Sequence, residues 1–397
     1  MTDFPPIFTT LGARPADGLL ALMLAYRADQ RPDKLDLGIG VYRDERGTTP
    51  VMEAVKAAER VLVETQATKV YLGVDGDSGF VSALAVIPFG ADRAADPRLV
   101  GMQTPGGTGA LRLAAELVGH ATAGKRVWIG TPTWANHIPI FRAAGVEIVE
   151  HPFFDPMTHR LDLEAMLESL GTATPGDAVL LHGCCHNPAG VDFTPAQWER
   201  IAELVARRRL LPIVDLAYQG LGRGLEADAL GTRLLFDRAE ALIVAYSCDK
   251  NYGLYRERTG ALWVRSPDES SVPGIQTAMR NPARSAWSMP PDHGAAIVRT
   301  ILASGELTQL WRTELDMMRQ RILELRQELA GAHPRLAQIA QQTGMFAMLP
   351  ITHEAVLTLR RDHGIYVADD GRMNVAGLTL DAIPRLVRAL EPWLDAA

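Results

Sequence analysis

Short apolar runs alternate with longer amphipathic stretches through the middle of the chain. Runs rich in β-branched residues predict strands, while apolar positions three and four residues apart predict helices. The expected helices include residues 109–119 and 194–209. The expected strands are residues 126–130, 146–150, 178–182, 212–216, 241–247 and 260–264. This alternation favours an α/β fold in which helices cover both faces of a parallel sheet.

The pattern changes after Glu306, where a long amphipathic helix is expected over residues 310–329. An apolar stretch at 344–349 and a terminal helix near 381–394 follow it. Because 397 residues exceed one ordinary core, we expect a second, smaller α+β domain here, packed with an N-terminal helix near 17–27. The predicted boundaries are an N-terminal arm at 1–13, a small domain at 14–46 and 312–397, and a large domain at 47–311.

Composition and charge narrow the possible functions. Hydrophobic residues make up 47% and charged residues 22%, a normal balance for a globular protein. The formal net charge of −7 argues against nucleic acid as the main partner, but it leaves room for a local cationic pocket that binds a small acid. No secretory pattern and no apolar run long enough to cross a bilayer are visible, so we expect a cytoplasmic protein with no membrane partner. The three cysteines, two of them adjacent, do not make a disulfide framework.

Lys250 stands out because the 40 basic residues include only five lysines. It comes four residues after the apolar run 241–246 ends, just before a turn that contains glycine. A desolvated lysine can lose its proton near neutral pH and form a Schiff base, whereas arginine cannot. The alternative is a solvated loop lysine, which is the commoner environment for a charged side chain. The neighbouring residues must decide between the two interpretations.

The residues after the other expected strands suggest a binding site, because ligands of open α/β sheets lie beyond the carboxyl ends of the strands. Gly107 and Thr108 precede a helix, where free N–H groups and the helix dipole favour an anion, although a plain capped turn is the alternative. Trp134 follows a strand and either stacks on a flat ring or belongs to the core. Asn187 precedes Pro188 in a turn that presents its amide.

A metal site is the alternative interpretation of segment 182–186, which holds His182, Cys184, Cys185 and His186. Adjacent cysteines converge poorly on one ion, and the chain has no matching second pair. We therefore expect a turn here and no metal.

Asp215 ends an apolar strand, where a carboxylate is either a helix cap or the partner of a buried cation. Arg258 either reaches a phosphate bound near Lys250 or forms a surface salt bridge. Together the strand ends describe one ligand with a phosphate, a flat ring, a ring hydroxyl, a basic ring nitrogen and an aldehyde. The matching residues are Gly107, Thr108, Ser247 and Arg258 for the phosphate, Trp134 for the ring, Asn187 and Tyr218 for the hydroxyl, Asp215 for the nitrogen and Lys250 for the aldehyde. That ligand is pyridoxal 5'-phosphate.

At these positions the chain closely resembles the class I aminotransferases, and within them the aspartate and aromatic amino acid branch. The resemblance covers nearly the whole chain, from residue 15 to residue 377. The matching segments are 37–42, 106–111, 182–188, 215–220 and 255–260. It implies a pyridoxal-phosphate-dependent transferase of fold type I, with a mostly parallel seven-stranded sheet in the large, cofactor-binding domain.

The resemblance also implies roles that spacing alone does not reveal. Arg372 matches the arginine that holds the substrate α-carboxylate, and Arg284 matches the arginine that reaches the distal carboxylate across a dimer interface. Tyr71 matches a tyrosine that touches the cofactor phosphate from the neighbouring subunit. Gly40, Trp134 and Asn187 match positions around the substrate, and His137 and His182 match supports of Asp215. Because Tyr71 and Arg284 would each reach the active site of the neighbouring subunit, the resemblance implies a homodimer with shared active sites.

The implied activity is ping-pong transfer of the amino group of phenylalanine, tyrosine, tryptophan and aspartate to 2-oxoglutarate. The partners would be small amino acids and 2-oxo acids, and the implied catalytic residues are Lys250, Asp215 and Tyr218. A strict aspartate aminotransferase is the nearest alternative. Another pyridoxal-phosphate enzyme of amino acids, such as a decarboxylase or a β-lyase, and a cofactor-binding regulator are more distant ones.

Three departures from the family pattern stand out. Asp249 replaces a small hydroxyl residue just before Lys250. Its carboxylate either repels the cofactor phosphate and weakens cofactor binding or points to solvent, and we expect the second. Val70 and Met289 stand where aspartate-selective members often carry asparagine. Apolar residues there would loosen the polar network that fixes Arg284 and so admit an aromatic side chain as well as an acidic one.

Overall fold

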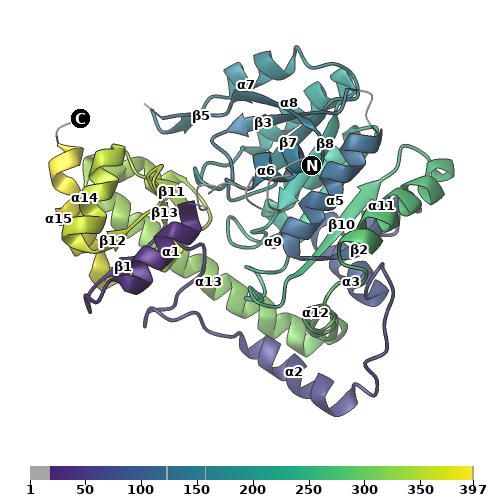
Figure 1. Ribbon diagram of the computed structural model, residues 1–397, viewed down its shortest axis with the longest axis horizontal. Coiled ribbons are helices and arrows are strands. Elements are labelled where there is room, and N and C mark those ends of the chain that lie inside the picture. The colour runs from purple at the N-terminus through teal and green to yellow at the C-terminus, as the bar shows by residue number, and fades with distance from the viewer. Residues whose placement is uncertain (1–17, 122–123, 157, 396–397) are drawn as a thin grey trace, which may run out of the picture.

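The computed structural model describes residues 18–121, 124–156 and 158–395 of the chain. Helices surround a central sheet, and a smaller group of helices and short strands lies to one side of it (Figure 1). The N-terminal arm predicted for residues 1–13 lies outside the described residues.

The central sheet has seven strands in the order β2-β10-β9-β8-β7-β3-β4. They are β2 (Leu99–Pro105), β3 (Arg126–Thr131), β4 (Glu147–Pro152), β7 (Ala178–His182), β8 (Leu211–Leu216), β9 (Leu242–Ser247) and β10 (Thr259–Arg265). Strand β10 runs antiparallel to both of its neighbours, and the other pairings are parallel. The prediction of a mostly parallel seven-stranded sheet is confirmed.

Two strands differ from the simple alternation expected from the sequence. Strand β10 reverses direction because only a loop separates it from β9, and a parallel return would require a longer crossover. Strand β2 was absent from the expected strands because Gly101 and the terminal Pro105 weaken its strand pattern.

Helices cover both faces of the sheet (Figure 1). One face packs against α5 (Gly106–Ala121), α6 (His137–Ala143) and α11 (Val272–Ala286). The other face packs against α3 (Ser78–Phe89), α7 (Leu163–Leu170), α8 (Pro195–Arg208), α10 (Leu230–Arg238) and α12 (His293–Ala303), while α2 (Glu53–Thr65) packs outside them on α12. The short helices α4 (Ala91–Ala94) and α9 (Leu225–Asp228) lie in connections. Every residue of β9 and β10 is buried, which explains the apolar runs that make up most of both strands.

The predicted helix at 194–209 illustrates how local sequence sets a boundary. Thr194 accepts a hydrogen bond from the Gln197 backbone, and the Gln197 side chain accepts one from the Thr194 backbone. This capping box starts α8, and Arg209 ends it in a left-handed conformation.

A third apolar cluster is built from Leu37 and residues between 325 and 394. Its elements are β1 (Leu35–Asp36), α13 (Gly305–Gly331), β11 (Phe346–Met348), α14 (His353–His363), β12 (Ile365–Tyr366), β13 (Arg372–Asn374) and α15 (Ile383–Leu394), and α1 (Gly18–Ala28) contacts β12 through Tyr26 and Tyr366. Strand β1 pairs with β12, so the N-terminal region joins the C-terminal one as expected. Helix α13 is continuous through the boundary predicted at 312, and the exact domain limits stay a prediction.

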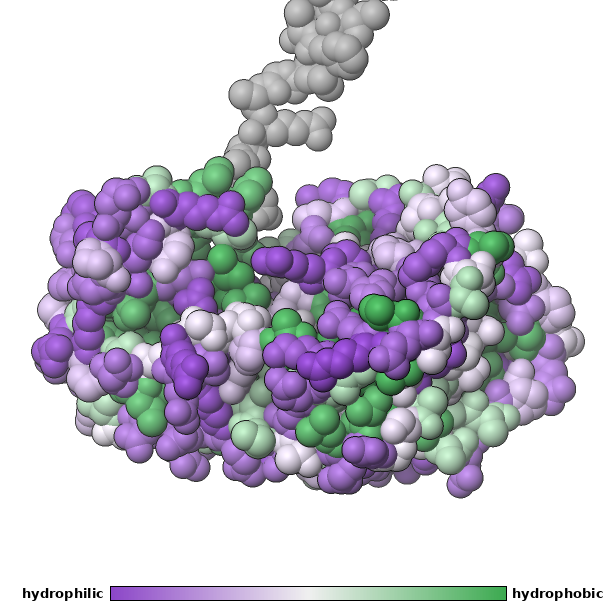
Figure 2. Space-filling model, turned by 90° about the horizontal axis from the view of Figure 1, so that it is seen from below, coloured by the Kyte–Doolittle hydropathy of each residue, from purple (hydrophilic) through white to green (hydrophobic). Residues whose placement is uncertain are grey.

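The surface is mostly hydrophilic, with apolar patches on the face seen in Figure 2. Large apolar side chains that remain exposed include Val61 and Val63 of α2 and Met317 of α13. Among the described residues, no helix combines the length and the apolar character needed to span a bilayer.

Candidate active site

A cavity of about 230 Å³ lies where the carboxyl ends of β3, β7, β8 and β9 meet the start of α5. Its lining residues are Gly40, Gly107, Thr108, Leu111, Trp134, His182, Asn187, Asp215, Ala217, Tyr218, Ser247, Asp249, Lys250, Tyr255 and Arg258. The structure therefore brings together all of the predicted cofactor-binding residues except Tyr71. Two predicted substrate residues, Arg284 and Arg372, are also absent from this lining.

Lys250 lies just beyond β9, and its side chain is 20% exposed. The amine lies 4.0 Å from Asp249 Oδ2 and 5.4 Å from the centre of the Tyr218 ring. Burial lowers the pKa of Lys250, while the charges of Asp249 and Asp215 partly oppose that shift. The neutral, nucleophilic form is thus favoured more than in a solvated lysine, which argues against the loop-lysine interpretation.

Asp215 ends β8 and is held by a histidine rather than acting as a helix cap. His137 Nε2 lies 3.0 Å from Asp215 Oδ2, and Thr133 Oγ1 lies 2.7 Å from His137 Nδ1. An ionised carboxylate only accepts hydrogen bonds, so Nε2 carries the proton. Burial acts to raise the pKa of Asp215, but the hydrogen bond from His137 and nearby positive charge outweigh it and leave the pKa lowered. The carboxylate therefore stays anionic beside the cavity.

Two further histidines pack behind this pair. The ring centres of His137 and His182 are 5.1 Å apart, and those of His182 and His186 are 4.0 Å apart. Burial lowers the pKa of His182 to about 3, so this ring is neutral. Trp134 packs edge-on against His137, lines the cavity and also packs against the apolar cluster on this face of the sheet, so its stacking on a ring stays a prediction.

One end of the cavity is suited to an anion. Gly106 has φ +68°, and a Cβ there would lie 2.7 Å from Arg258 Nη2. A Cβ on Gly107 would lie 3.0 Å from Ser247 Cβ, so this turn needs glycine to approach the end of β9. Helix α5 begins here, and its free N–H groups and dipole add positive potential to that of Arg258.

Asp249 does not point to solvent, and that expectation was wrong. Its side chain is buried, and Arg258 Nη1 lies 2.5 Å from Asp249 Oδ2. The Asp249 backbone N–H donates to Ser247 Oγ at 3.2 Å, which folds this turn back toward the strand end. The positive charge of Arg258 then attracts the carboxylate inward. Among the described residues, Asp249 Oδ1 is buried without a hydrogen-bond partner.

A short polar chain connects the cavity to the other part of the molecule. Asn187 Nδ2 donates to the Tyr218 hydroxyl at 3.3 Å, and Arg372 Nη1 donates to Asn187 Oδ1 at 3.3 Å. Arg372 also donates to the Gly38 carbonyl at 2.9 Å. Burial raises the pKa of Tyr218, so its hydroxyl stays protonated. The Asn187 side chain thus lies between Arg372 and the cavity.

Tyr71 and Arg284 lie away from the cavity of their own chain. The Tyr71 side chain is 87% exposed, and Arg284 is exposed and donates to Ser288 Oγ. Val70 is 74% exposed, and the Leu72 backbone N–H contacts Met289 Sδ at 3.2 Å. Neither Tyr71 nor Arg284 contributes to this site within a single chain.

Sequence reasoning missed Tyr255 and Phe346. Tyr255 lines the cavity, and its hydroxyl accepts a hydrogen bond from the Tyr42 backbone N–H at 3.0 Å. Phe346 packs beside the cavity entrance, since a Cβ on Gly40 would lie 2.7 Å from Phe346 Cζ and the Arg372 guanidinium lies 4.8 Å from the ring centre. Tyr255 belongs to the segment that contains Arg258, which was a usable signal, but Phe346 looks like an ordinary core residue.

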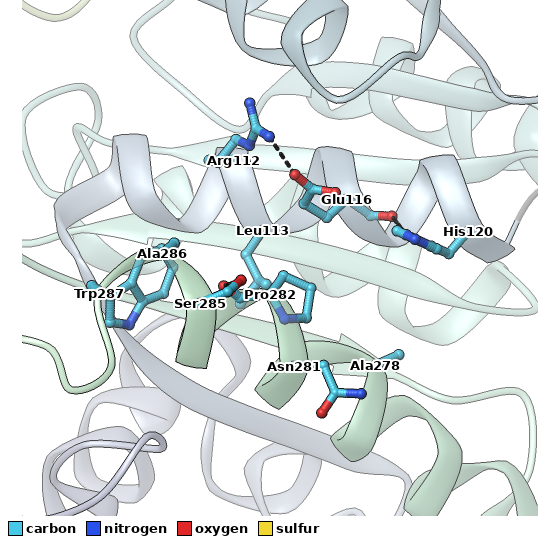
Figure 3. Close-up of a pocket in the computed structure, with 10 residues that line it drawn as sticks. All are labelled: Arg112, Leu113, Glu116, His120, Ala278, Asn281, Pro282, Ser285, Ala286 and Trp287. Atoms are coloured by element: carbon cyan, nitrogen blue, oxygen red, sulfur yellow. Dashed lines mark hydrogen bonds and ion pairs between the residues drawn. The ribbon is translucent and has the colours of Figure 1, made fainter.

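A larger hollow of about 610 Å³ lies between α5 and α11 (Figure 3). Its charged groups, Arg112 and Glu116, already form an ion pair with each other. It holds no set of convergent reactive groups, so we take the smaller cavity as the candidate active site.

Two groups of side chains among the described residues are close enough together to hold a metal ion, but both are already engaged within the protein. His137, His182 and Asp215 form the hydrogen-bonded support described above. The second group is Cys184, Cys185 and Asp228. Burial raises the pKa of Cys185 to about 12, and Asp228 accepts hydrogen bonds from three backbone N–H groups. A neutral thiol is a poor metal ligand, so we propose no metal site.

The sheet, with a desolvated lysine, a buried carboxylate and an anion site at adjacent strand ends, is typical of pyridoxal-phosphate-dependent transferases. The sequence model of the family "Aminotransferase class I and II" matches residues 32–390. The chain belongs to this family, whose members depend on pyridoxal phosphate.

Three relatives illustrate the similarity. The chain is 48% identical to a tyrosine aminotransferase of Rhizobium meliloti (strain 1021), over 94% of this chain and 96% of the relative. It is 45% identical to an aspartate aminotransferase of Escherichia coli (strain K12), over 97% and 99%. A solved structure of an aromatic-amino-acid aminotransferase from Burkholderia pseudomallei, covalently bound to pyridoxal phosphate, superposes with a TM-score of 0.94 at 37% identity, over 98% of this chain and 99% of that one.

The residues present fit the cofactor. Gly107 leaves a space against Ser247 that a side chain would fill, which gives a phosphate close access to the start of α5. Asp215 is held as an anion on the far side of the cavity, and Lys250 lies between these two ends. The one residue that fits poorly is Asp249, because its negative charge lies at the phosphate end.

Proposed function

We propose that this aminotransferase acts on phenylalanine, tyrosine and tryptophan as well as on aspartate, and that 2-oxoglutarate is the amino-group acceptor in a ping-pong cycle. The observation that carries the site assignment is the desolvated amine of Lys250, placed between anionic Asp215 and cationic Arg258 in one cavity. Exchange between two acids also requires cations for the substrate carboxylates, and Arg372 is the nearest candidate.

The bound cofactor supplies an electron-withdrawing ring that stabilises negative charge at the substrate α-carbon. Lys250 Nζ would hold the cofactor aldehyde and would move a proton from the substrate α-carbon. Asp215, oriented by His137, would hold a proton on the ring nitrogen. Tyr218 and Asn187 would donate hydrogen bonds to the ring hydroxyl, and Trp134 would stack on the ring.

Arg372 is proposed to bind the substrate α-carboxylate. Its guanidinium is fixed by Gly38, Asn187 and the face of Phe346, so it is oriented before the substrate arrives. Gly40 lies beside Phe346 at the cavity edge and leaves room for the substrate. Closure of the smaller domain over the bound substrate would exclude water from the reacting atoms.

Dual specificity rests on the surroundings of Arg284. Arg284 donates to the Ser288 hydroxyl, and the next residue, Met289, offers only a thioether. Val70 is exposed and apolar. Asparagine amides at 70 and 289 would offer strong hydrogen bonds in place of these apolar groups. An arginine held so loosely can move aside for an aromatic ring and return for a second carboxylate.

The test of specificity compares kcat/KM for phenylalanine and tyrosine with that for aspartate, with 2-oxoglutarate as acceptor. Comparable values support dual specificity, whereas negligible aromatic turnover identifies a strict aspartate aminotransferase. The matched variant Val70→Asn with Met289→Asn should shift the ratio toward aspartate. Release of CO₂ or ammonia would indicate a decarboxylase or a lyase.

A homodimer with shared active sites is part of the proposal. It is supported by the exposure of Tyr71 and Arg284, and by exposed Val70 and Leu72 on the same segment as Tyr71. In a dimer, Tyr71 of the neighbouring subunit would contact the cofactor phosphate and Arg284 of that subunit would contact the distal carboxylate.

Mixing two inactive variants tests the shared site. Lys250→Ala removes the amine, and Arg284→Ala removes the distal cation needed for aspartate. If the two residues act in one site from different subunits, mixed dimers regain aspartate turnover in one of their sites. If Arg284 serves its own chain, mixing restores nothing.

We also propose that the protein is cytoplasmic. The support is a solved structure described as an aspartate aminotransferase from the cytoplasm of Saccharomyces cerevisiae, which is 32% identical to this chain and covers 98% of it. Cell fractionation with detection of the intact chain would test this location.

A further inference from the structure

Asp249 is the feature of the site that the proposed function leaves unexplained. Its side chain is 6% exposed and lines the cavity at the end where Gly107, Thr108, Ser247 and Arg258 would hold a phosphate. Oδ2 pairs with Arg258 at 2.5 Å, and Oδ1 has no partner among the described residues. A Cβ on Gly106 would lie 3.5 Å from Asp249 Oδ2, so the carboxylate reaches the start of α5 itself.

The charges at this end do not balance for a phosphate dianion. Arg258 supplies one positive charge, the start of α5 supplies roughly half a charge, and Asp249 supplies one negative charge. A phosphate ester above about pH 7 adds nearly two negative charges, since its second pKa is about 6. A carboxylate and a dianion at such close range repel strongly in a site with little water. The free energy of the complex falls if one proton binds between the Asp249 carboxylate and the phosphate.

We propose that Asp249 makes binding of the cofactor phosphate take up one proton. The proton comes from solvent and lies between the carboxyl and a phosphate oxygen, where a protonated Asp249 donates the hydrogen bond that Oδ1 lacks. Two strongly coupled acids share such a proton, and the same uptake results whichever oxygen carries it. This inference rests on the proposed cofactor site.

The other groups that face Asp249 do not supply this proton change. Tyr255, which precedes Arg258 in the same loop, has its pKa raised by burial to about 12. Cys248 is the preceding residue, and burial raises its pKa as well. The start of α5 contributes Gly106, Gly107 and Thr108, none of which titrates. Lys250 lies 4.0 Å away and does titrate, so the same comparison is repeated with Lys250→Met in both proteins, which removes its contribution.

The experiment measures proton uptake when the cofactor-free, full-length protein binds pyridoxamine 5'-phosphate. This form of the cofactor has no aldehyde, so it forms no covalent bond with Lys250. Titration calorimetry at pH 8 in two buffers of different ionisation enthalpy gives the number of protons taken up. The wild type is compared with Asp249→Asn, which keeps the shape and removes the charge. Asp249→Ser provides a second variant if the first fails to fold.

The wild type should take up about one proton more than Asp249→Asn when it binds pyridoxamine 5'-phosphate. The ratio of the wild-type dissociation constant to that of the variant should then rise about tenfold for each pH unit from about pH 7 to about pH 9. Pyridoxamine without phosphate should show no such difference between the two proteins. Equal proton uptake by wild type and variant overturns the proposal for Asp249. If no protein binds pyridoxamine 5'-phosphate, the cofactor site itself is misassigned, which is a distinct outcome.

Discussion

Replacing Arg326 by methionine should destabilise the fold and loosen the substrate side of the active site together. Arg326 extends from α13 and is fully buried. Its guanidinium donates to the carbonyl oxygens of Thr343 at 2.8 Å, Gly344 at 2.8 and 3.0 Å, and Phe346 at 2.5 Å. It therefore anchors the segment that carries Phe346 to the long helix.

The magnitude follows from the three carbonyl groups that lose a close donor. Each loss costs about 1–1.5 kcal/mol, and methionine returns part of the total because it brings no charge into the interior. The expected net cost is about 2–4 kcal/mol. With an unfolding entropy of about 2.1 cal/mol/K per residue, the melting temperature should fall by about 2–5 °C.

The functional consequence comes from Phe346, whose ring lies beside Gly40 and under Arg372. A displaced ring should move Arg372 and raise KM for the amino donor more than it lowers kcat. The matched control is Arg361→Met, because the Arg361 side chain is 70% exposed and forms an ion pair with its neighbour Asp362. Differential scanning calorimetry and steady-state kinetics of both variants provide the measurements. If Arg326→Met and Arg361→Met have the same melting temperature, the anchoring role of Arg326 is refuted.

Three more predictions follow from the site and its supports. Asp215→Asn should keep the fold but lower kcat by about 10²- to 10³-fold, because it removes the fixed charge behind the ring, and an unchanged kcat would contradict that role. Burial lowers the pKa of Lys250 in the folded chain, so the unfolded chain holds the proton more tightly and stability must increase as pH rises toward the unfolded value of 10.5. Cofactor-free Lys250→Met should therefore be more stable than wild type near neutral pH in urea titrations, with a difference that shrinks as pH increases, and a constant difference would contradict the pKa shift. Thr194→Ala should cost about 1 kcal/mol by removing the capping box of α8 without affecting KM, as urea titration and kinetics would show.

Much of the fold was predictable because the relevant signals are local. The expected strand at 178–182 coincides with β7, and the other expected strands differ from the observed ones by one or two residues at their ends. The helix at 194–209 carries its own start signal in Thr194 and Gln197. Strand β2 was missed because Gly101 weakens its pattern, and the tertiary sheet overrides that weakness.

The cavity residues were predictable for a related reason. Parallel strands end at one edge of a sheet, so Asn187, Asp215 and Lys250 had to lie near one another once their strands were recognised. Tyr71 and Arg284 could be named only through the family resemblance, and the single chain leaves both outside the cavity.

The sequence by itself determined most of the strands and helices, and which reactive side chains stand at the strand ends, because apolar periodicity is a local signal. Only the tertiary structure decided that β10 runs antiparallel, that α13 continues through the expected domain boundary, and that Asp249 turns inward to Arg258. The direction of a loop side chain depends on the balance between solvation and the charges that distant segments bring close. That balance exists only after the chain has packed.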